Sequence, residues 1–182
     1  MHIDRAWRPG VRGATGAALA AALVACSPTL DWREARPEGS GAALMFPCRP
    51  EQHERKVPLG GAILPMRMHA CSAGDANFSL ATLDVADPAQ VTPELAALRA
   101  QVLVNLDASG AEERPLALAG ATPNPESARV HIVGKRPDGS RVVADAAFFV
   151  KGLTLYQATV LGSGDAPGHE AVDTFFGAIR LL

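Results

Sequence analysis

The chain has 182 residues, of which 48% are hydrophobic and 5% aromatic, and its 17 Lys and Arg residues nearly balance its 19 Asp and Glu residues. This length fits one domain rather than an enzyme of several large domains. The near-neutral charge excludes polybasic nucleic-acid binding, so we expect no nucleic-acid partner. A charged content of 20%, with hydrophobic residues through most of the chain, also excludes wholesale disorder.

The first 25 residues have the pattern of an export signal. Arg5, Arg8 and Arg12 precede an apolar run of 12 residues at positions 14–25, which is a basic segment followed by a hydrophobic one. A helix of this length spans about 18 Å and falls short of the roughly 30 Å hydrocarbon core of a bilayer. The sequence therefore predicts a cleaved signal peptide over residues 1–25 and not a transmembrane helix.

The apolar run ends in Leu23-Val24-Ala25-Cys26, which resembles the lipobox of bacterial lipoproteins. The resemblance implies that Cys26 is lipidated by acyl chains such as palmitate, becomes the first residue of the mature chain and attaches it to a membrane. An ordinary secretory signal that contains a cysteine is the alternative. Ser27 stands where inner-membrane lipoproteins of some bacteria have Asp, so the resemblance favours a periplasm-facing outer-membrane location in the cell envelope.

Residues 26–41 form the next segment, which is rich in Pro, Gly and charged residues and has little apolar periodicity. This composition predicts a flexible tether between the lipid and a globular domain over residues 42–182. Trp32 is the exception within it. We expect Trp32 to pack on the domain rather than at the membrane interface, because Asp31 and Glu34 would be repelled by anionic headgroups.

Two cysteines remain once Cys26 is assigned to lipid. Cys48 and Cys71 each close a segment with strand character, residues 42–48 and residues 63–71. An even pair in an oxidising compartment predicts a structural disulfide. A reactive thiol pair and metal ligation are the alternatives.

Soft metal ligands gather at Met66, Met68, His69 and Cys71, a combination that copper prefers. In a strand, Met66 and Met68 share one face while His69 and Cys71 share the other, so one strand does not turn all four inward. Methionines at alternating positions are also typical of core filling. Copper or small-ligand binding through Met66, Met68 and His69 therefore stays as the alternative function.

The remaining elements follow from periodicity and turn residues. Residues 53–55 are charged, and we expect a solvated loop there. Apolar spacing predicts a helix over 93–107, with Thr92 as its N-cap and Pro93 at its first position. Residues 116–121 are either a strand or an irregular connection. The further expected elements are a strand over 77–85, a meander of strands over 128–134, 141–150 and 153–161 with a Pro137-Asp138-Gly139 turn, and a terminal helix with Val172, Phe175, Phe176 and Ile179 on one face.

This order of elements predicts an α+β domain in which an antiparallel sheet carries a central and a C-terminal helix. Three short fragments accompany this order, one early in the domain, one late and one at its end: Met45-Phe46-Pro47, Leu155-Tyr156-Gln157 and Phe175-Phe176 with Ile179-Arg180. With them, residues 42–182 resemble the PsbP-like fold of photosystem extrinsic subunits and bacterial envelope lipoproteins. The resemblance implies a binding or assembly role and transfers no catalytic residue.

Catalytic signatures are absent from the sequence. It has no G-x-S-x-G elbow, no phosphate-binding G-x-x-x-x-G-K-[ST] loop and no C-x-x-C pair. His169 and Asp173 predict a solvated pair at a helix N-terminus, because a zinc site would need histidine at both positions. The spacing implies no carboxylate partner for His131. We therefore expect no enzyme and no cofactor, but an envelope lipoprotein that binds or helps to assemble a membrane-protein partner.

Overall fold

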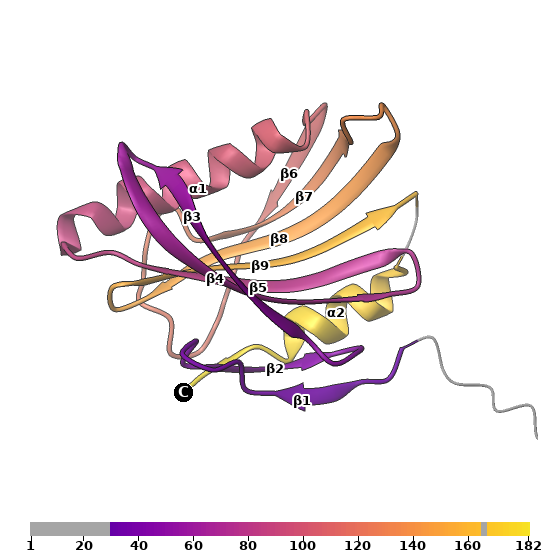
Figure 1. The fold of residues 1–182 in the computed structure, drawn as a ribbon, viewed down its shortest axis with the longest axis horizontal. Helices are drawn as coiled ribbons and strands as arrows, with labels where there is room; N and C mark the ends of the chain where they lie inside the picture. The colour runs from indigo at the N-terminus through magenta and orange to yellow at the C-terminus, as the bar shows by residue number, and fades with distance from the viewer. Residues whose placement is uncertain (1–29, 165–166) are drawn as a thin grey trace, which may run out of the picture.

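The computed structural model describes residues 30–164 and 167–182, so the predicted signal peptide and Cys26 lie outside the described residues. The described part contains ten strands, two α-helices and one short 3-10 helix. Its strand pairs are antiparallel, and the two helices pack on the strands (Figure 1). The α+β class predicted from the sequence is confirmed.

The main sheet has seven strands. Two consecutive hairpins over β3, β4 and β5 form one half, and a meander over β6, β7, β8 and β9 forms the other. The halves join because β9 pairs with β5. Since β6 lies at the far edge of the sheet, the chain between β5 and β6 must cross the sheet, and this connection contains the first α-helix. The spatial order is β3 (Glu51–Leu59), β4 (Ala62–Ala73), β5 (Ala76–Asp84), β9 (Thr154–Ser163), β8 (Arg141–Lys151), β7 (Ala128–Lys135) and β6 (Gly110–Arg114).

A second, three-stranded sheet is formed by β1 (Arg33–Ala35), β2 (Ala42–Phe46) and β10 (Arg180–Leu181), with β2 in the middle. The sequence predicts a tether as far as residue 41, whereas β1 pairs with β2 and Ser40 is buried. The side chains of β1 are largely exposed, so its pairing leaves no trace in hydropathy. Trp32 packs edge-on against Phe78 with ring centroids 5.9 Å apart, as expected.

The two helices are α1 (Val91–Asn105) and α2 (His169–Gly177). The start predicted for α1 at Pro93 is wrong by two residues. Asp87 caps a short 3-10 turn (Pro88–Gln90) by accepting a hydrogen bond from the Ala89 N–H at 2.8 Å, and α1 continues directly from that turn.

Other boundaries also differ from those predicted. Of the two alternatives for residues 116–121, the structure has the irregular connection, and the next residue, Thr122, makes an isolated bridge to Val150. Residues 53–55, expected in a loop, lie in β3. The predicted terminal helix ends at Gly177, and Ile179 is buried beyond its end.

Both faces of the main sheet are covered, which gives three layers (Figure 1). Helix α1 packs on one face, here the α1 face, and α2 packs with the small sheet on the other, the α2 face. The central strands therefore present apolar side chains on both sides. On the α1 face these include Leu83, Leu155, Phe148 and Val150, and on the α2 face Phe78, Leu80, Tyr156, Ala158 and Phe149.

The end of α1 rests directly on β7 at Gly134. A Cβ added at Gly134 would lie 2.1 Å from the carbonyl oxygen of Leu106, which follows the last residue of α1. The next amide, Lys135 N–H, donates a hydrogen bond to the same oxygen at 2.7 Å. Only glycine permits this approach, because a backbone atom cannot move aside as a flexible side chain can.

We predict that Gly134→Ala lowers the free energy of unfolding by about 2 kcal/mol, since the methyl group overpacks the contact and forces the helix end away from its hydrogen bond. Gly110→Ala is the matched control, because a Cβ at Gly110 meets no atom within 4 Å. Urea unfolding of both variants checks this. Equal stabilities for the two variants would contradict the contact.

Candidate functional site

A polar pocket of about 380 Å³ lies on the α2 face, between strands β7–β9 and the N-terminal end of α2. Its walls combine apolar and ionisable side chains from both sides of the gap. Three valines and a proline form the apolar part, and two histidines, an arginine and an aspartate form the polar part. The pocket is lined by His131, Arg141, Val143, Asp145, Val160, Pro167, His169 and Val172, among others.

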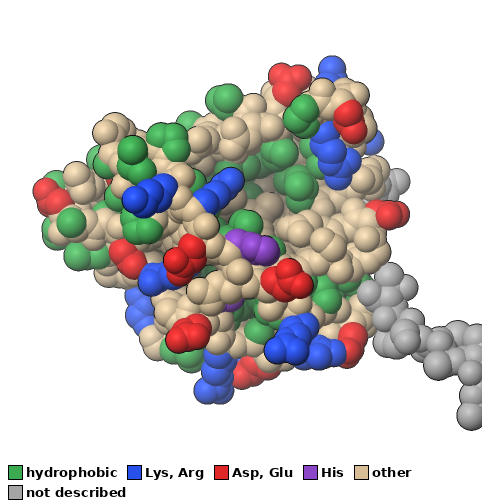
Figure 2. Space-filling model, viewed as in Figure 1, with side chains coloured by type: hydrophobic (Ala, Val, Ile, Leu, Met, Phe, Trp, Pro, Cys, Tyr) green, Lys and Arg blue, Asp and Glu red, His purple; other side chains and the backbone are tan. Residues whose placement is uncertain are grey.

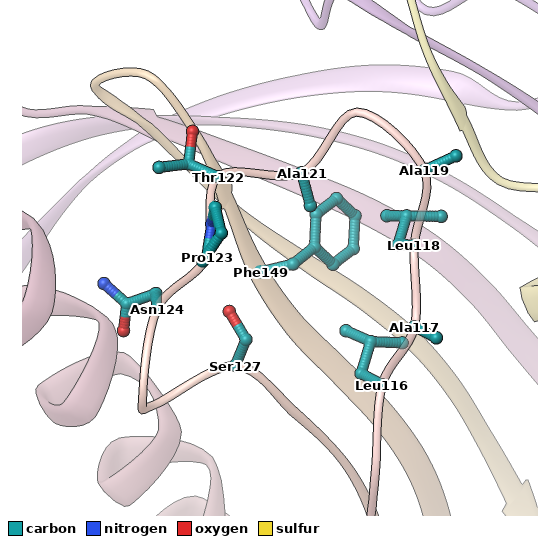
Figure 3. Close-up of a pocket in the computed structure, with 10 residues that line it drawn as sticks. All are labelled: Leu116, Ala117, Leu118, Ala119, Ala121, Thr122, Pro123, Asn124, Ser127 and Phe149. Carbon is teal, nitrogen blue, oxygen red and sulfur yellow. The ribbon is translucent and has the colours of Figure 1, made fainter.

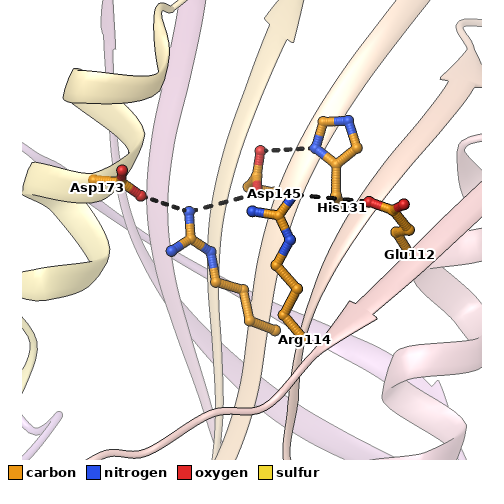
Figure 4. Close-up of polar contacts among 6 residues, drawn as sticks. Glu112, Arg114, His131, Asp145 and Asp173 are labelled. Atoms are coloured by element: carbon orange, nitrogen blue, oxygen red, sulfur yellow. Dashed lines mark hydrogen bonds and ion pairs between the residues drawn. The ribbon is translucent and has the colours of Figure 1, made fainter.

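The centre of the polar pocket is a histidine and aspartate pair. His131 on β7 stands directly across from Asp145 on β8. The imidazole Nδ1 lies 3.1 Å from the Asp145 Oδ2 (Figure 4). A carboxylate at this position accepts the Nδ1–H, which fixes the ring tautomer and leaves Nε2 free.

Arg129 connects this pair to α2. Its guanidinium lies 3.6 Å from the Asp145 carboxylate and 3.3 Å from that of Asp173 on α2. The same guanidinium stacks over the Phe176 ring, 4.3 Å from the centroid, which adds a cation–π attraction. Arg129 therefore balances the charge of Asp145 and ties the helix to the sheet.

The sequence predicts no carboxylate partner for His131, and this prediction is wrong, because Asp145 is its partner. In a hairpin centred on Asp138, the residues at 131 and 145 are equally far from the turn, so the predicted Pro137-Asp138-Gly139 turn already implied their pairing. The expected His169 and Asp173 pair does not form, since Asp173 contacts Arg129 instead. Both of its members are exposed.

The chemistry of the polar pocket suits binding. A histidine with a carboxylate partner acts as a base when a nucleophile or acidic proton is within reach. The described residues that line the pocket include no Ser, Thr, Cys, Tyr or Lys. Polar groups on an apolar floor are instead the usual features of a small-ligand site.

The charged surface continues to the edge of the sheet, where β6 carries Glu112 and Arg114 (Figure 4). Their side chains form an ion pair at 3.7 Å. Glu112 stands across from His131, and Arg114 stands across from Arg129. Charges of opposite sign thus alternate along this edge.

The predicted copper ligands do not converge. Met66 and Met68 pack against the core on the α1 face. His69 pairs across the strand with Leu80, which belongs to the core of the α2 face, and its Nε2 lies 3.3 Å from the Gln52 side-chain oxygen. Opposite faces of one strand therefore separate the methionines from the histidine. Within residues 30–164 and 167–182, no three His, Cys, Asp or Glu side chains gather as a metal site.

The predicted disulfide joins Cys48 and Cys71, whose Cα atoms are 6.0 Å apart. Cys71 on β4 stands across from Phe78, so the bridge ties the main sheet to the segment that follows β2. A bridge at this place holds the second layer on the α2 face.

A second cavity of about 580 Å³ lies beneath the connection between β6 and β7. Figure 3 shows the Phe149 ring inside the arch that this connection makes, with Leu116 and Leu118 on one side and Pro123 on the other. Phe149 is fully buried. The arch thus covers one part of the α2 face, where Leu116 and Leu118 pack against the core.

No protein-family model matches the chain, and no curated protein matches it. Neither helix in the described part of the chain has the length and apolar character needed to cross a bilayer.

We predict that replacing both bridging cysteines, Cys48→Ala with Cys71→Ala, lowers the free energy of unfolding by about 3 kcal/mol, because the closed loop constrains the unfolded chain. Urea unfolding measures the loss. The wild-type protein in excess reductant should unfold at the same urea concentration as the variant, and an unfolding curve that does not respond to reductant would contradict a structural role.

His69 predicts a pH dependence of stability. Burial, and then the nearby Arg67 guanidinium, lower the pKa of His69 below its ordinary value of 6.5, and Glu38 partly opposes them. The unfolded chain therefore takes up a proton that the folded chain resists, and the free energy of unfolding falls as the pH drops below 6.5.

The variant His69→Gln should weaken this dependence between about pH 7.5 and pH 5.5. His53→Gln, which removes an exposed histidine from the adjacent strand β3, is the matched control and should leave the dependence intact. Urea midpoints at both ends of this range give the comparison. An unchanged slope in His69→Gln would show that His69 does not cause it.

Proposed function

We propose that this protein is an exported, lipid-anchored module of the cell envelope whose α+β domain, PsbP-like in type, binds or helps to assemble a partner and has no catalytic activity of its own. The observation that carries the proposal is the Cys48–Cys71 disulfide. Such bridges persist in oxidising compartments and are rare in the cytosol. The basic and apolar leader over residues 1–25 and the lipobox ending at Cys26 point to the same location.

The surface of the domain supports a binding role. Figure 2 shows hydrophobic side chains gathered in a hollow of the α1 face, next to α1 and rimmed by charged side chains. Partly buried apolar residues that pack against the core of this face include Met68, Leu103, Leu106 and Leu161. Apolar surface that is concave and has a polar rim is typical of interaction sites.

Attachment at Cys26 fits the position of the described chain. The first described residue, Leu30, lies only four residues after Cys26 and lines a shallow depression with Trp32 and the first turns of α2. A chain of four residues extends at most about 14 Å. The membrane proposed here would therefore lie close to the α2 layer and leave the hollow of the α1 face directed away from it.

Intact mass spectrometry of the protein recovered from membranes tests this proposal. We expect a mass that matches residues 26–182 plus acyl groups, and alkylation of Cys48 and Cys71 only after reduction. The variant Cys26→Ser should lose the acyl mass and leave the membrane fraction, because it has no acyl chain to hold it in the bilayer.

Cys26→Ser also separates the anchor from the fold, because it leaves both bridging cysteines in place. A full-length, unmodified chain in the cytosolic fraction, with both thiols alkylated before reduction, would contradict export and lipidation together. A chain that starts after residue 25 without acyl groups would contradict only the anchor.

A further inference from the structure

The polar pocket between β7–β9 and α2 contains polar side chains that have no partner among the described residues. Arg141 at the start of β8 and His169 at the start of α2 both line it, and neither makes a side-chain hydrogen bond or ion pair with any other described residue. His131 donates its Nδ1–H to Asp145, so its Nε2 is an acceptor, and it contacts no other described side chain. Three ring or guanidinium groups are thus available to one ligand.

The backbone adds donors at the same place. Helix α2 has Gly168 as its N-cap, and within the described part of the chain this cap has no side-chain hydrogen bond. Gly168 and His169 both line the pocket. The Ala171 N–H bonds to the Gly168 carbonyl oxygen, which leaves the His169 and Glu170 N–H groups without a partner within the helix. Such groups favour a negative charge, so they reinforce the Arg141 guanidinium.

Among the described lining residues of the pocket, Arg141 is the only Lys or Arg, and no described carboxylate pairs with it. Asp145 is the only carboxylate among its described lining residues, and the Arg129 guanidinium pairs with it at 3.6 Å. The two acidic residues of α2 are used elsewhere. Asp173 contacts Arg129, and Glu170 lines the separate depression beside Trp32.

The apolar part of the wall restricts the type of anion. Val143, Val160 and Val172 enclose the pocket from β8, β9 and α2, and Pro167 adds a fourth apolar surface. Val160 and Val172 are buried, whereas Val143 and Pro167 are partly exposed, and a compact hydrocarbon body would cover these two where a bare inorganic ion would leave them against water. The volume of about 380 Å³ is within the usual range for small-molecule sites.

We propose that this pocket binds a small organic carboxylate. The carboxylate lies on Arg141 and the first turn of α2, the hydrocarbon body lies against the three valines, and His131, held by Asp145, supplies a polar contact through Nε2. This site goes beyond the proposed envelope role and does not depend on export or on lipidation.

A nuclear magnetic resonance titration of the purified full chain with benzoate tests the site. Saturable shifts of the Val143, His169 and Val172 amides at concentrations below about 10 mM would support it. Benzamide is the matched ligand control, because it has the same shape without the charge, and it should bind at least about tenfold more weakly. Inorganic phosphate, which lacks the apolar body, should also bind more weakly than benzoate.

A pair of variants isolates the cationic contact. Arg141→Gln should weaken benzoate binding by about tenfold, the loss expected for one charge-assisted hydrogen bond. Arg136→Gln is the matched control, because it removes the same charge from the nearby turn, where Arg136 donates to Ser163 Oγ at 3.1 Å and does not line the pocket. It should leave the affinity within about twofold.

Each remaining outcome counts against the site. No shift with benzoate, equal binding of benzoate and benzamide, tighter binding of phosphate, or equal affinities for Arg141→Gln and Arg136→Gln would each overturn the proposal. Failure here would leave the mass-spectrometric test of the envelope role untouched, because that test reads only the mature N-terminus and the disulfide.

Discussion

Burial of the main sheet on both of its faces is the constraint on which the rest of this structure depends. The central strands β5, β9 and β8 alternate apolar side chains toward two cores, so neither face is stable in water alone. The chain meets this need with α1 on one face and with α2 and the small sheet on the other (Figure 1). The Phe175 ring marks the second core, since it contacts Phe46 of β2 and Phe78 of β5 with centroids 5.5 Å apart in each case.

The same constraint explains where the polar pocket lies. The cover on the α2 face is widest over β5 and β9 and ends toward β7 and β6, where side chains on that face become charged. His131 and Asp145 stand in one cross-strand row, with Glu112 beside them on β6. The polar pocket thus lies at the margin of the core, where apolar walls from β9 and α2 meet polar side chains from β7 and β8.

A tie between the layers holds this arrangement. The Tyr156 hydroxyl donates to the buried Ser40 carbonyl oxygen at 2.7 Å, and the Tyr156 ring stacks on Phe149. Burial, and then the charge of Asp84, raise the pKa of Tyr156, so the hydroxyl keeps its proton and remains a donor. The segment before β2 is therefore part of the fold, although its composition is that of a tether.

The sequence predicts those parts of the fold whose side chains report their surroundings. The strands at 76–84, 141–151 and 154–163 and both helices are recognisable because they bury apolar residues in regular patterns. The edge strands β3 and β6 and the short β1 were missed, because their pairing uses backbone groups and their side chains are mostly exposed.

The contacts of the candidate site also divide into those that the sequence predicts and those that depend on strand register or packing. The Cys48–Cys71 bridge followed from an even pair of cysteines behind an export signal. The His131 and Asp145 pair needed the register of a hairpin, which the Asp138 turn contains but residue spacing along the chain does not. The contact of Arg129 with α2 joins residues 44 positions apart and required the packing of the two layers.

Amide hydrogen exchange of the full chain tests the two-sided burial most directly. If the account is correct, amides of β5 and β9 exchange only when the whole domain unfolds, while those of the exposed edge strand β6 exchange through local opening at least about tenfold faster. Exchange of β5 and β9 at the rate of β6 would contradict it, because strands enclosed by two cores cannot open without exposing both.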